Sequence, residues 1–301
     1  MTTTVVVAGG TGDLGHRIVR ELLTHDTYVR VLTRPGSGAA QDLFGDTDRV
    51  DVVEASYSDP AALAAATSGA HTVVSAVSGI RPVIVDAQHA LLTAALSAGV
   101  QRFIPSDFSA DYRQIARGSN RNFELRREFA AELDAAPLRA TSVLNGMFTD
   151  LLTGVAPMIL FTQGRVLFWS DPDQILDFTT KDDTARFTAR VALDDDAPRV
   201  MEIAGDRVTA RDIAATMTEL TGDRFKLQWA GTTSTLGAMA TIGRLADRKA
   251  EDTFPAWQGM QYFVSMFSGQ AQLHHVDNDR YGAQSWATVR EVLETHVRRD
   301  G

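Results

Sequence analysis

The chain of 301 residues contains no cysteine. This absence excludes disulfide bonds, thiolate catalysis and zinc sites of the cysteine type. The sequence also lacks a stretch of about 18 uncharged apolar residues, so no membrane-spanning helix is expected. The first four residues lead into a predicted strand without a basic and apolar leader segment. We therefore expect a cytoplasmic protein without a membrane partner.

Clustered positive charge is missing as well. The 38 acidic residues outnumber the 29 basic ones and give a net charge of −9. The densest basic run, residues 117–127, is interleaved with polar and acidic residues and is expected to form a solvated helix face. Because nucleic-acid binding needs clustered Lys and Arg against the phosphates, no direct nucleic-acid partner is expected. The hydrophobic content of 44% is sufficient for a folded core.

The first half of the chain alternates between strand and helix patterns. Val5–Ala8 is a short, continuous apolar run, as expected for a parallel strand that is buried on both faces. Asp59 and Pro60 are typical of a helix N-cap and first helical position. Strands are predicted at residues 5–8, 28–32, 50–53, 72–77, 102–104 and 140–144, and helices at 14–23, 61–66, 83–97 and 122–133. This alternation predicts an α/β fold, namely a doubly wound parallel-sheet Rossmann domain with helices on both faces.

The second half is less regular and predicts a smaller C-terminal α+β region. Thr209 is expected to cap a helix that ends before Gly222. Other predicted elements are strands at 165–169, 199–204 and 225–229, and helices at 182–191 and from 233 onward. The aromatic and Met residues between 257 and 267 are expected in the core rather than in a ligand pocket. We expect a Rossmann domain at 1–150 and a substrate-binding region at 151–301, and leave open whether later strands return to the first sheet.

Three evenly spaced glycines separate the first strand from the first helix. Residues 9–15 read GGTGDLG. Gly9 permits the tight turn, Gly12 lets a pyrophosphate approach the backbone, and Gly15 lets the helix pack closely on the sheet. The free N–H groups and the dipole at the helix N-terminus favour the negative charge of a diphosphate. The pattern predicts a dinucleotide site formed by Gly9, Thr11, Gly12, Asp13, Leu14 and Gly15.

The end of the second strand distinguishes between the two nicotinamide dinucleotides. An NAD site usually has an acidic residue there for the ribose 2′-hydroxyl, whereas this chain reads Val31-Leu32-Thr33-Arg34. A guanidinium group binds phosphate through two charge-assisted hydrogen bonds. Arg34 therefore predicts NADP(H) as the cofactor, and the alternative is an ordinary surface arginine.

These features together resemble the NmrA-like and isoflavone-reductase-like families of atypical short-chain dehydrogenases/reductases. The resemblance covers nearly the whole chain. It rests on Gly9–Gly15, Arg34, Arg102–Phe108 (RFIPSDF), Leu144–Phe148 (LNGMF) and Val276–Gly282 (VDNDRYG). It implies a Rossmann domain that binds NADP(H), a C-terminal region that shapes a substrate cleft, and no metal. Some members reduce aromatic natural products, whereas others bind NADP(H) and report redox state to a partner protein without turnover.

The resemblance implies further cofactor contacts beyond the glycine turn. The end of the fourth strand should run beside the adenosine ribose and phosphates, the segment after the fifth should line the nicotinamide side of the cleft, and the segment after the sixth should lie opposite. The residues concerned are Ser75, Ala76, Val77, Pro105, Ser106, Asp107, Phe108, Asn145 and Gly146. These positions agree with the rule that ligands bind outside the carboxyl ends of parallel strands. For each of them the alternative is an ordinary loop role.

The lysines that the resembling enzymes use for catalysis are missing. The only lysines are Lys181, Lys226 and Lys249, and none of them follows a tyrosine by four positions. The Tyr-x-x-x-Lys pair of ordinary short-chain dehydrogenases is therefore absent. Isoflavone-reductase-like enzymes instead use a lysine on the helix after a Pro-Ser-Glu-Phe segment, and the matching residues here, 123–129, contain none.

Three other residues are candidates for the catalytic chemistry. Arg126 lies near the position of the missing lysine. A guanidinium group does not act as a general base in proteins, yet Arg126 could hold a phenolate, enolate or carboxylate. Tyr112 could donate a proton to a carbonyl oxygen, and Asp107 lies near the expected cleft. The structural alternatives are an exposed Arg126 paired with Glu124 or Glu128, loop packing for Tyr112, and hydrogen bonds to backbone N–H groups for Asp107.

His274, His275 and Asp277 superficially suggest a metal site. Adjacent residues on a strand point in opposite directions, and no third ligand is found at a useful spacing. We therefore expect no metal.

The favoured hypothesis is an NADPH-dependent oxidoreductase that reduces an aromatic or conjugated carbonyl small molecule, with Tyr112, Arg126 or water handling the oxygen. The main alternative is an NADP(H)-binding redox sensor of the NmrA type, which acts on a protein partner without turnover and explains the missing lysine directly. A non-redox natural-product enzyme on the same scaffold is the third possibility.

Overall fold

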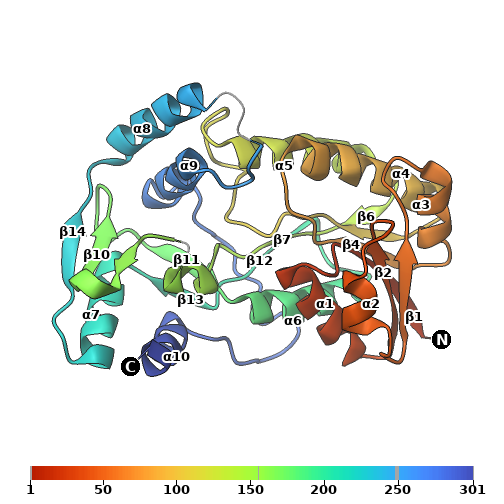
Figure 1. Cartoon of the computed structure of the whole chain (residues 1–301), viewed down its shortest axis with the longest axis horizontal. Coiled ribbons are helices and arrows are strands. Elements are labelled where there is room, and N and C mark those ends of the chain that lie inside the picture. Colours follow the sequence, from red (N-terminus) through yellow and green to blue (C-terminus); the bar gives the residue numbers. More distant parts are fainter. Residues whose placement is uncertain (1, 155, 248–250, 301) are drawn as a thin grey trace. The chain divides into compact units, whose positions relative to one another are not determined.

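The computed structural model describes residues 2–154, 156–247 and 251–300 (Figure 1). Lys249 lies outside the described residues. The chain forms two compact units. Unit 1 consists of Met1–Asp107, Leu125–Val143 and Thr184–Met201, and unit 2 consists of Phe108–Glu124, Leu144–Asp183 and Glu202–Gly301. None of the helices in the described ranges combines the length and the apolar composition needed to cross a bilayer.

Unit 1 is built on a six-stranded parallel sheet with the order β3-β2-β1-β4-β5-β6. Its strands are β1 (Thr3–Ala8), β2 (Thr27–Thr33), β3 (Val50–Glu54), β4 (Thr72–Ser75), β5 (Arg102–Ile104) and β6 (Arg139–Ala140). This is the Rossmann strand order, in which the winding of the chain reverses between the first and fourth strands. The predicted parallel sheet is confirmed, and the crevice for a ligand is expected at the ends of β1 and β4.

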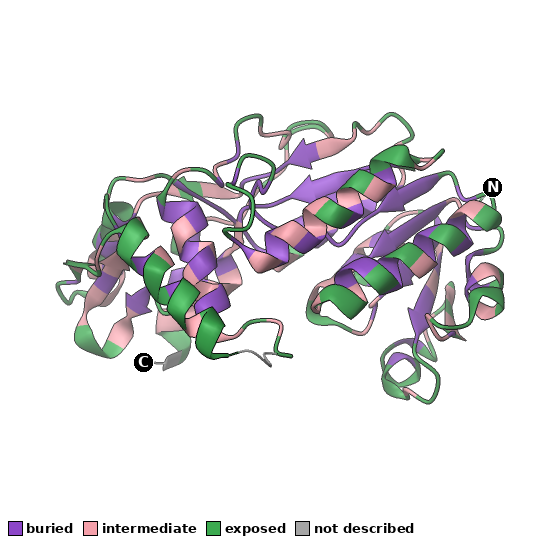
Figure 2. Ribbon diagram, turned by 90° about the horizontal axis from the view of Figure 1, so that it is seen from above, coloured by how far each residue is buried: buried purple, intermediate pink, exposed green. Residues whose placement is uncertain are grey.

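Helices cover both faces of this sheet, and the strands between them are largely buried (Figures 1 and 2). Helix α1 (Asp13–Leu23) lies on one face, and α3 (Pro60–Thr67), α4 (Gln88–Ser97) and α5 (Arg121–Ala135) lie on the other; α2 (Ala39–Phe44) follows β2, and α6 (Lys181–Ala192) follows a strand of unit 2. The Asp59 carboxylate accepts hydrogen bonds from the Ala61 and Ala62 N–H groups, at 3.1 and 3.0 Å. This is the cap that the sequence predicts for α3.

Two predicted elements of unit 1 differ locally from the structure. The predicted helix at 83–97 begins with a π-helical turn, η1 (Pro82–Ala87), before α4. The predicted strand at 140–144 is two strands, because β6 pairs with β5 whereas β7 (Ser142–Leu144) pairs with β12 (Val200–Glu202). Between them, the Thr141 hydroxyl donates to the Pro198 carbonyl at 2.8 Å.

Unit 2 contains two three-stranded sheets, β14-β10-β9 and β13-β11-β8. Their strands are β8 (Met147–Phe148), β9 (Ile159–Leu160), β10 (Arg165–Phe168), β11 (Leu176–Thr179), β13 (Asp206–Val208) and β14 (Lys226–Trp229). The other elements are the 3₁₀ turns η2 (Thr149–Thr153) and η3 (Phe161–Gln163) and helices α7 (Ala210–Thr221), α8 (Thr233–Ala246), α9 (Ala256–Phe267) and α10 (Val289–Asp300). Thr209 and Asp212 form a capping box at the start of α7, and Gly222 ends it in the left-handed conformation.

The aromatic segment of α9 forms part of the core of unit 2. The Trp169 ring stacks on Phe263 with 4.9 Å between centroids and meets the edge of Phe267 at 5.4 Å. Met266 belongs to the same buried cluster. This segment is therefore core, as the sequence predicts.

Candidate functional site

Two glycines of the turn after β1 are required by close backbone contacts. Gly9 has a φ of +77°, and a Cβ there would lie 2.7 Å from the Ala76 carbonyl oxygen. A Cβ on Gly15 would lie 2.1 Å from the Gly9 carbonyl oxygen. The turn thus packs against the end of β4 on one side and against the first turn of α1 on the other, which only glycine permits.

The N-terminus of α1 is open to a ligand's negative charge. Gly12 is the N-cap, and no side chain caps the helix there. The Gly12 N–H itself closes the turn by donating to the Gly9 carbonyl at 2.9 Å. A Cβ on Gly12 would meet only that carbonyl oxygen, at 3.3 Å. Backbone N–H groups at such a helix start bind phosphate.

Arg34 directly follows β2 and is exposed. Burial raises the pKa of the nearby Tyr57 to about 12, and the positive charge of Arg34 opposes that shift. A guanidinium group beside the second strand is thus available for an anion.

The ends of β4 and β5 are joined by a serine. The Ser106 hydroxyl donates to the Val77 carbonyl at 2.6 Å, and the Ser106 N–H donates to Gln88 Oε1 at 2.9 Å. Ser75 is fully buried, and its hydroxyl has no hydrogen-bond partner among the described residues. A buried hydroxyl without a partner is costly unless a ligand or water completes it.

Asp107 follows these residues and is 1% exposed. The Ser142 hydroxyl donates to Asp107 Oδ2 at 2.6 Å, and Arg199 Nη1 donates to the Ser142 hydroxyl at 2.7 Å. Arg199 is held in turn by an ion pair between its Nε and Asp134 Oδ1, at 2.5 Å. The carboxylate of Asp107 is therefore anchored by a chain of side-chain hydrogen bonds inside unit 1.

Arg126, the other candidate in unit 1, is half-buried on α5. One partner considered for it, Glu128, forms a bidentate ion pair with Arg81. This pairing lowers the pKa of Glu128, mainly through the hydrogen bonds from Arg81.

The remaining predicted residues belong to unit 2. Asn145 is fully buried, and neither its Oδ1 nor its Nδ2 has a hydrogen-bond partner in the described part of the chain. Gly146 next to it has a φ of +67°, and a Cβ there would lie 2.3 Å from the Asp177 carbonyl oxygen. Phe108 is buried. An uncompensated buried amide beside a glycine that lines a pocket is an expected feature of a ligand site.

Tyr112 is 4% exposed and lies in a group of aromatic rings. It stacks on Phe123 with 6.1 Å between centroids, and Phe123 meets Tyr262 edge to face at 5.1 Å. The Tyr262 hydroxyl accepts a hydrogen bond from Asn122 Nδ2 at 3.1 Å. The position of the Tyr112 ring is thus fixed by packing.

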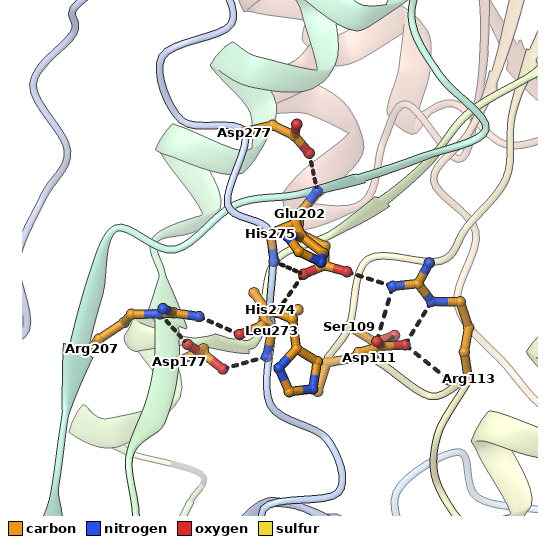
Figure 3. A network of polar contacts seen from close by, with 11 residues as sticks. Ser109, Asp111, Arg113, Asp177, Glu202, Arg207, Leu273, His274, His275 and Asp277 are labelled. Carbon is orange, nitrogen blue, oxygen red and sulfur yellow. Dashed lines mark hydrogen bonds and ion pairs between the residues drawn. The ribbon is translucent and has the colours of Figure 1, made fainter.

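Unit 2 also buries a carboxylate network that sequence reasoning missed (Figure 3). Arg113 binds both oxygens of the buried Asp111 carboxylate, through Nε at 2.8 Å and Nη2 at 2.9 Å, and also pairs with Glu202. These contacts, chiefly the hydrogen bonds to Asp111, raise the pKa of Arg113. Glu202 Oε2 accepts the backbone N–H groups of His274 and His275, at 2.7 and 2.9 Å.

The residues of the VDNDRYG motif attach the C-terminal segment Ala271–Asn278, here called the strap, to β12. Asp277 Oδ2 accepts the Glu202 N–H at 2.8 Å. Asn278 accepts from the Ala204 N–H at 3.1 Å and donates to the Ala204 carbonyl at 2.7 Å. The motif is therefore structural here, since its side chains imitate the bonds of a neighbouring strand.

A second buried carboxylate holds the other end of the strap. Asp177 on β11 accepts Arg207 Nε at 2.7 Å on one oxygen and the Leu273 N–H at 2.8 Å on the other (Figure 3). Arg207 also donates to the Leu273 carbonyl. Burial raises the pKa of Asp177, and the hydrogen bonds from Leu273 and Arg207 offset only part of this effect.

Asp177 and the strap line a small pocket of unit 2. Its volume is about 10 Å³, close to the least that one water molecule needs. Met147, Leu176 and Met266 give it an apolar lining, and Asp177 is its only ionisable side chain. No sequence motif predicts this pocket, because the residues that line it come from distant positions in the chain.

No group of three or more His, Asp or Glu side chains within residues 2–154, 156–247 and 251–300 is arranged to hold a metal ion. His274 and His275 are exposed, and it is their backbone N–H groups that bind Glu202.

Comparison with known sequences identifies the family. A sequence model of the NmrA-like family matches residues 1–244. The chain belongs to the NmrA-like family.

Curated relatives of this NmrA-like protein include plant reductases. It is 31% identical over 214 residues to pinoresinol reductase 2 of Arabidopsis thaliana, an alignment that spans 64% of this chain and 65% of that enzyme. It is 28% identical over 240 residues to the bifunctional pinoresinol-lariciresinol reductase 1 of Linum usitatissimum, across 74% of this chain and 76% of the relative. The alignment thus spans less than two thirds of the Arabidopsis enzyme.

Solved structures share the NmrA-like fold over almost the whole chain. The structure of AtPrR2 with NADP⁺ and (+)-pinoresinol has a TM-score of 0.81 at 23% identity, covering 98% of this chain and 99% of the other. A crystal structure of isoflavone reductase has a TM-score of 0.80 at 20% identity, with the same coverage. These likenesses confirm the predicted fold class.

Proposed function

We propose that this NmrA-like protein binds NADP(H) through unit 1 and reduces an aromatic or conjugated carbonyl small molecule. The observation that carries the proposal is the turn from Gly9 to Gly15, which leaves the N-terminus of α1 without a side-chain cap. Arg34 beside the second strand supports NADP(H) over NAD(H), because a guanidinium group matches the 2′-phosphate. The names of the plant relatives, which are reductases of aromatic compounds, agree with it.

The proposed cofactor residues divide by the part of NADP(H) that each would hold. Gly9, Thr11, Gly12, Asp13, Leu14 and Gly15 would bind the diphosphate, and Ser75, Ala76 and Val77 would lie along the adenosine ribose and phosphates. The buried hydroxyl of Ser75 supports this assignment, because it has no partner among the described residues. Pro105, Ser106, Asp107, Phe108, Asn145 and Gly146 are proposed for the nicotinamide side, where the buried Asn145 amide would gain a hydrogen-bonding partner.

The chemistry divides between the cofactor and the chain. When bound, NADPH supplies a hydride to an electrophilic carbon. Arg126 would stabilise the negative charge on the substrate oxygen, and Tyr112 would donate a proton to it. We assign Asp107 to positioning, because its carboxylate is buried and anchored through Ser142. The substrate region, expected at residues 151–301, would correspond mainly to unit 2.

A redox sensor remains the second candidate function. The observation in its favour is the absence of lysine from residues 123–129 and of the Tyr-x-x-x-Lys pair. Such a protein would bind a protein partner and discriminate NADPH from NADP⁺, because a ligand shifts a conformational equilibrium only through differential affinity.

One experiment separates the two functions. NADPH affinity is measured by calorimetry, and NADPH oxidation is followed by absorbance with pinoresinol and a panel of quinones, enones and aromatic aldehydes. A reductase oxidises NADPH with at least one compound, and Tyr112→Phe and Arg126→Gln lower kcat without weakening NADPH binding. Tight binding without oxidation across the panel contradicts the reductase. Equal affinities for NADPH and NADP⁺ contradict the sensor.

A further inference from the structure

Helix α4 carries a glutamine at a position where its pattern favours an apolar residue. Positions i, i+3, i+4 and i+7 of a helix form one face, and on α4 this face is buried and consists of Gln88, Leu91, Leu92 and Ala95. Gln88 is 1% exposed. Burial of an amide is unfavourable unless its hydrogen bonds to water are replaced inside the protein.

Gln88 joins the start of its helix to the turn that follows β5. Its Nε2 donates to the Ile84 carbonyl at 2.6 Å, and its Oε1 accepts the Ser106 N–H at 2.9 Å. Ser106 is itself buried. The amide therefore connects two backbone groups that are both shielded from water, and all three residues belong to unit 1.

The turn before Gln88, η1, is π-helical, a rare conformation that occurs mainly at functional sites. In an α-helix the N–H of residue 88 would bond to the carbonyl of residue 84. Here the Gln88 N–H donates to the Val85 carbonyl, and the Ile84 carbonyl accepts Gln88 Nε2. The side chain thus replaces a bond that the backbone of a regular helix would make, and its other end reaches Ser106.

The same π-helical turn also supports the end of β4. Ile84 and Val85 are buried in a small apolar cluster that Val77 joins. The Val77 carbonyl accepts the Ser106 hydroxyl at 2.6 Å. The segments after the neighbouring strands β4 and β5 are therefore held by one turn, on the side where a Rossmann sheet binds its ligand.

The segment Pro105–Asp107 lies outside the helices and strands of unit 1, so its conformation depends on a few bonds. The Asp107 N–H donates to the Pro105 carbonyl at 2.8 Å, and Ser142 holds the Asp107 carboxylate. The bond from Ser106 to Gln88 fixes the middle of the segment. Without it a buried N–H would lack a partner, and the segment would shift towards another acceptor.

We propose that Gln88 is a positioning residue for the nicotinamide half of NADP(H), and that it acts by fixing the Ser106 N–H in the segment Pro105–Asp107. This inference rests on the proposed function, which assigns that segment to the nicotinamide side. Both ends of the Gln88 amide are bound to backbone groups, so its effect on the cofactor is indirect.

The test compares NADP⁺ with adenosine 2′,5′-bisphosphate, which contains the adenosine half of the cofactor and lacks the nicotinamide. Calorimetry measures the affinity of the full chain for each ligand. Gln88→Met keeps a flexible side chain of similar length and removes both hydrogen bonds. The affinity for NADP⁺ should fall at least about fivefold, as expected for one lost hydrogen bond, and the affinity for the bisphosphate less than about twofold.

Thr67 supplies a matched control, because it is fully buried and also bonds to the backbone of α4. Its hydroxyl donates to the carbonyls of Leu63 and Ala94, at 2.9 and 3.3 Å. Thr67 ends α3, which leads into the start of β4, whereas Ser106 follows the end of β5. Thr67→Val should lower the Tm, as Gln88→Met also does, and should leave both affinities within about twofold of the wild type.

A second measurement uses the wild type alone. Hydrogen exchange of the Ser106 and Asp107 N–H groups reports local opening of the segment. NADP⁺ should slow this exchange more than the bisphosphate does, because only NADP⁺ carries the nicotinamide. This result is obtained even if Gln88→Met does not fold.

Four outcomes overturn the positioning role. These are an unchanged NADP⁺ affinity in Gln88→Met, equal losses for both ligands in that variant, a loss of NADP⁺ affinity in Thr67→Val as large as in Gln88→Met, and equal slowing of exchange by both ligands. If the wild type binds NADP⁺ and any of these occurs, only the positioning role fails. If the wild type does not bind NADP⁺, the proposed function fails with it.

Discussion

In unit 1 the groups proposed to face the cofactor are mainly backbone atoms, whereas the buried polar network of unit 2 consists of side chains, namely carboxylates paired with arginines. The turn at Gly9–Gly15 presents N–H groups because it lacks side chains. In unit 2, the carboxylates of Asp111, Asp177 and Glu202 are buried and pair with the exposed side chains of Arg113 and Arg207.

This difference suggests how each unit responds to change. A site made of backbone tolerates substitutions that leave its conformation intact and fails when a side chain intrudes. A site made of buried charges retains its conformation only while each charge keeps its partner, because an isolated buried charge is strongly unfavourable. Substitutions in the two units should therefore have different consequences.

The largest effect is expected from Gly15→Ala. The new Cβ would lie 2.1 Å from the Gly9 carbonyl oxygen, so the turn must move and the N–H groups at the start of α1 lose their arrangement. We expect NADPH binding to be abolished and the free energy of unfolding to fall by about 1–3 kcal/mol, as measured by calorimetry and urea unfolding. Gly259→Ala on α9 is the control, because its Cβ would meet nothing within 4 Å. Wild-type NADPH affinity in Gly15→Ala would contradict the backbone account of unit 1.

Arg34→Ala tests the one side chain on which cofactor choice in unit 1 is proposed to depend. Loss of the guanidinium group should weaken NADPH binding at least about tenfold, because charge-assisted bonds to the 2′-phosphate disappear. NADH lacks this phosphate and serves as the internal control, with an affinity that should change little. Titrations that show equal losses for both cofactors would refute the assignment.

Ser142→Ala tests the buried polar chain of unit 1. Without its hydroxyl, Asp107 loses one hydrogen bond and Arg199 loses its link to Asp107. The free energy of unfolding in urea should fall by about 1–3 kcal/mol, the usual cost of leaving a buried polar group unsatisfied. Ser97→Ala on α4, at an exposed position, should change it by less than about 0.5 kcal/mol. Equal effects of the two substitutions would mean that the hydrogen bonds linking Asp107, Ser142 and Arg199 do not contribute to stability.

The smallest expected effect is a pH dependence of the stability of unit 2. The pKa of Asp177 is raised from its ordinary value of 3.8, mainly by burial. The folded state therefore holds this proton more tightly than the unfolded chain. The contribution of Asp177 to the free energy of unfolding is fully present below pH 3.8 and is lost as the pH rises through the raised pKa. The Tm of the wild type should accordingly fall relative to that of Asp177→Asn over this interval.

Glu291 provides the comparison of opposite sign. Its pKa is lowered, chiefly by the hydrogen bond from the Thr288 N–H. The contribution of Glu291 to the free energy of unfolding is present above its ordinary pKa and is lost as the pH falls through its lowered pKa. Relative to Glu291→Gln, the wild type should gain Tm as the pH rises. The Tm difference between the wild type and each variant, Asp177→Asn and Glu291→Gln, is measured against pH. If both differences change with pH in the same direction, the pH response does not come from these residues.

Local sequence patterns were sufficient for the elements of unit 1 that depend on nearby residues. The apolar run of β1, the glycine turn and the Asp59 cap each lie within a few positions of the atoms they bind. The break at Thr141 was missed, because it depends on pairing with residues near position 200. The short strands β8, β9, β11 and β13 were also missed, since two to four residues show no readable period.

The residues of the candidate site also differ in how far apart they lie in the sequence, and only those that lie close together could be predicted. The Gly9–Gly15 turn was predicted because all of its members are adjacent. The pocket around Asp177 was not, because its partners Arg207 and Leu273 lie 30 and 96 residues away. Spacing in a sequence carries no information about such a group, and Asp177 itself has neighbours typical of a strand.

The division of each unit into three segments has a consequence for synthesis on the ribosome. The chain passes between the units five times, at 107/108, 124/125, 143/144, 183/184 and 201/202. Unit 1 therefore lacks its last segment until residue 201 has emerged, and by then the first two of the three segments of unit 2 have already been made. A nascent chain must hold both incomplete folds at once. For the same reason, neither unit can be transferred to another protein as a single continuous gene segment.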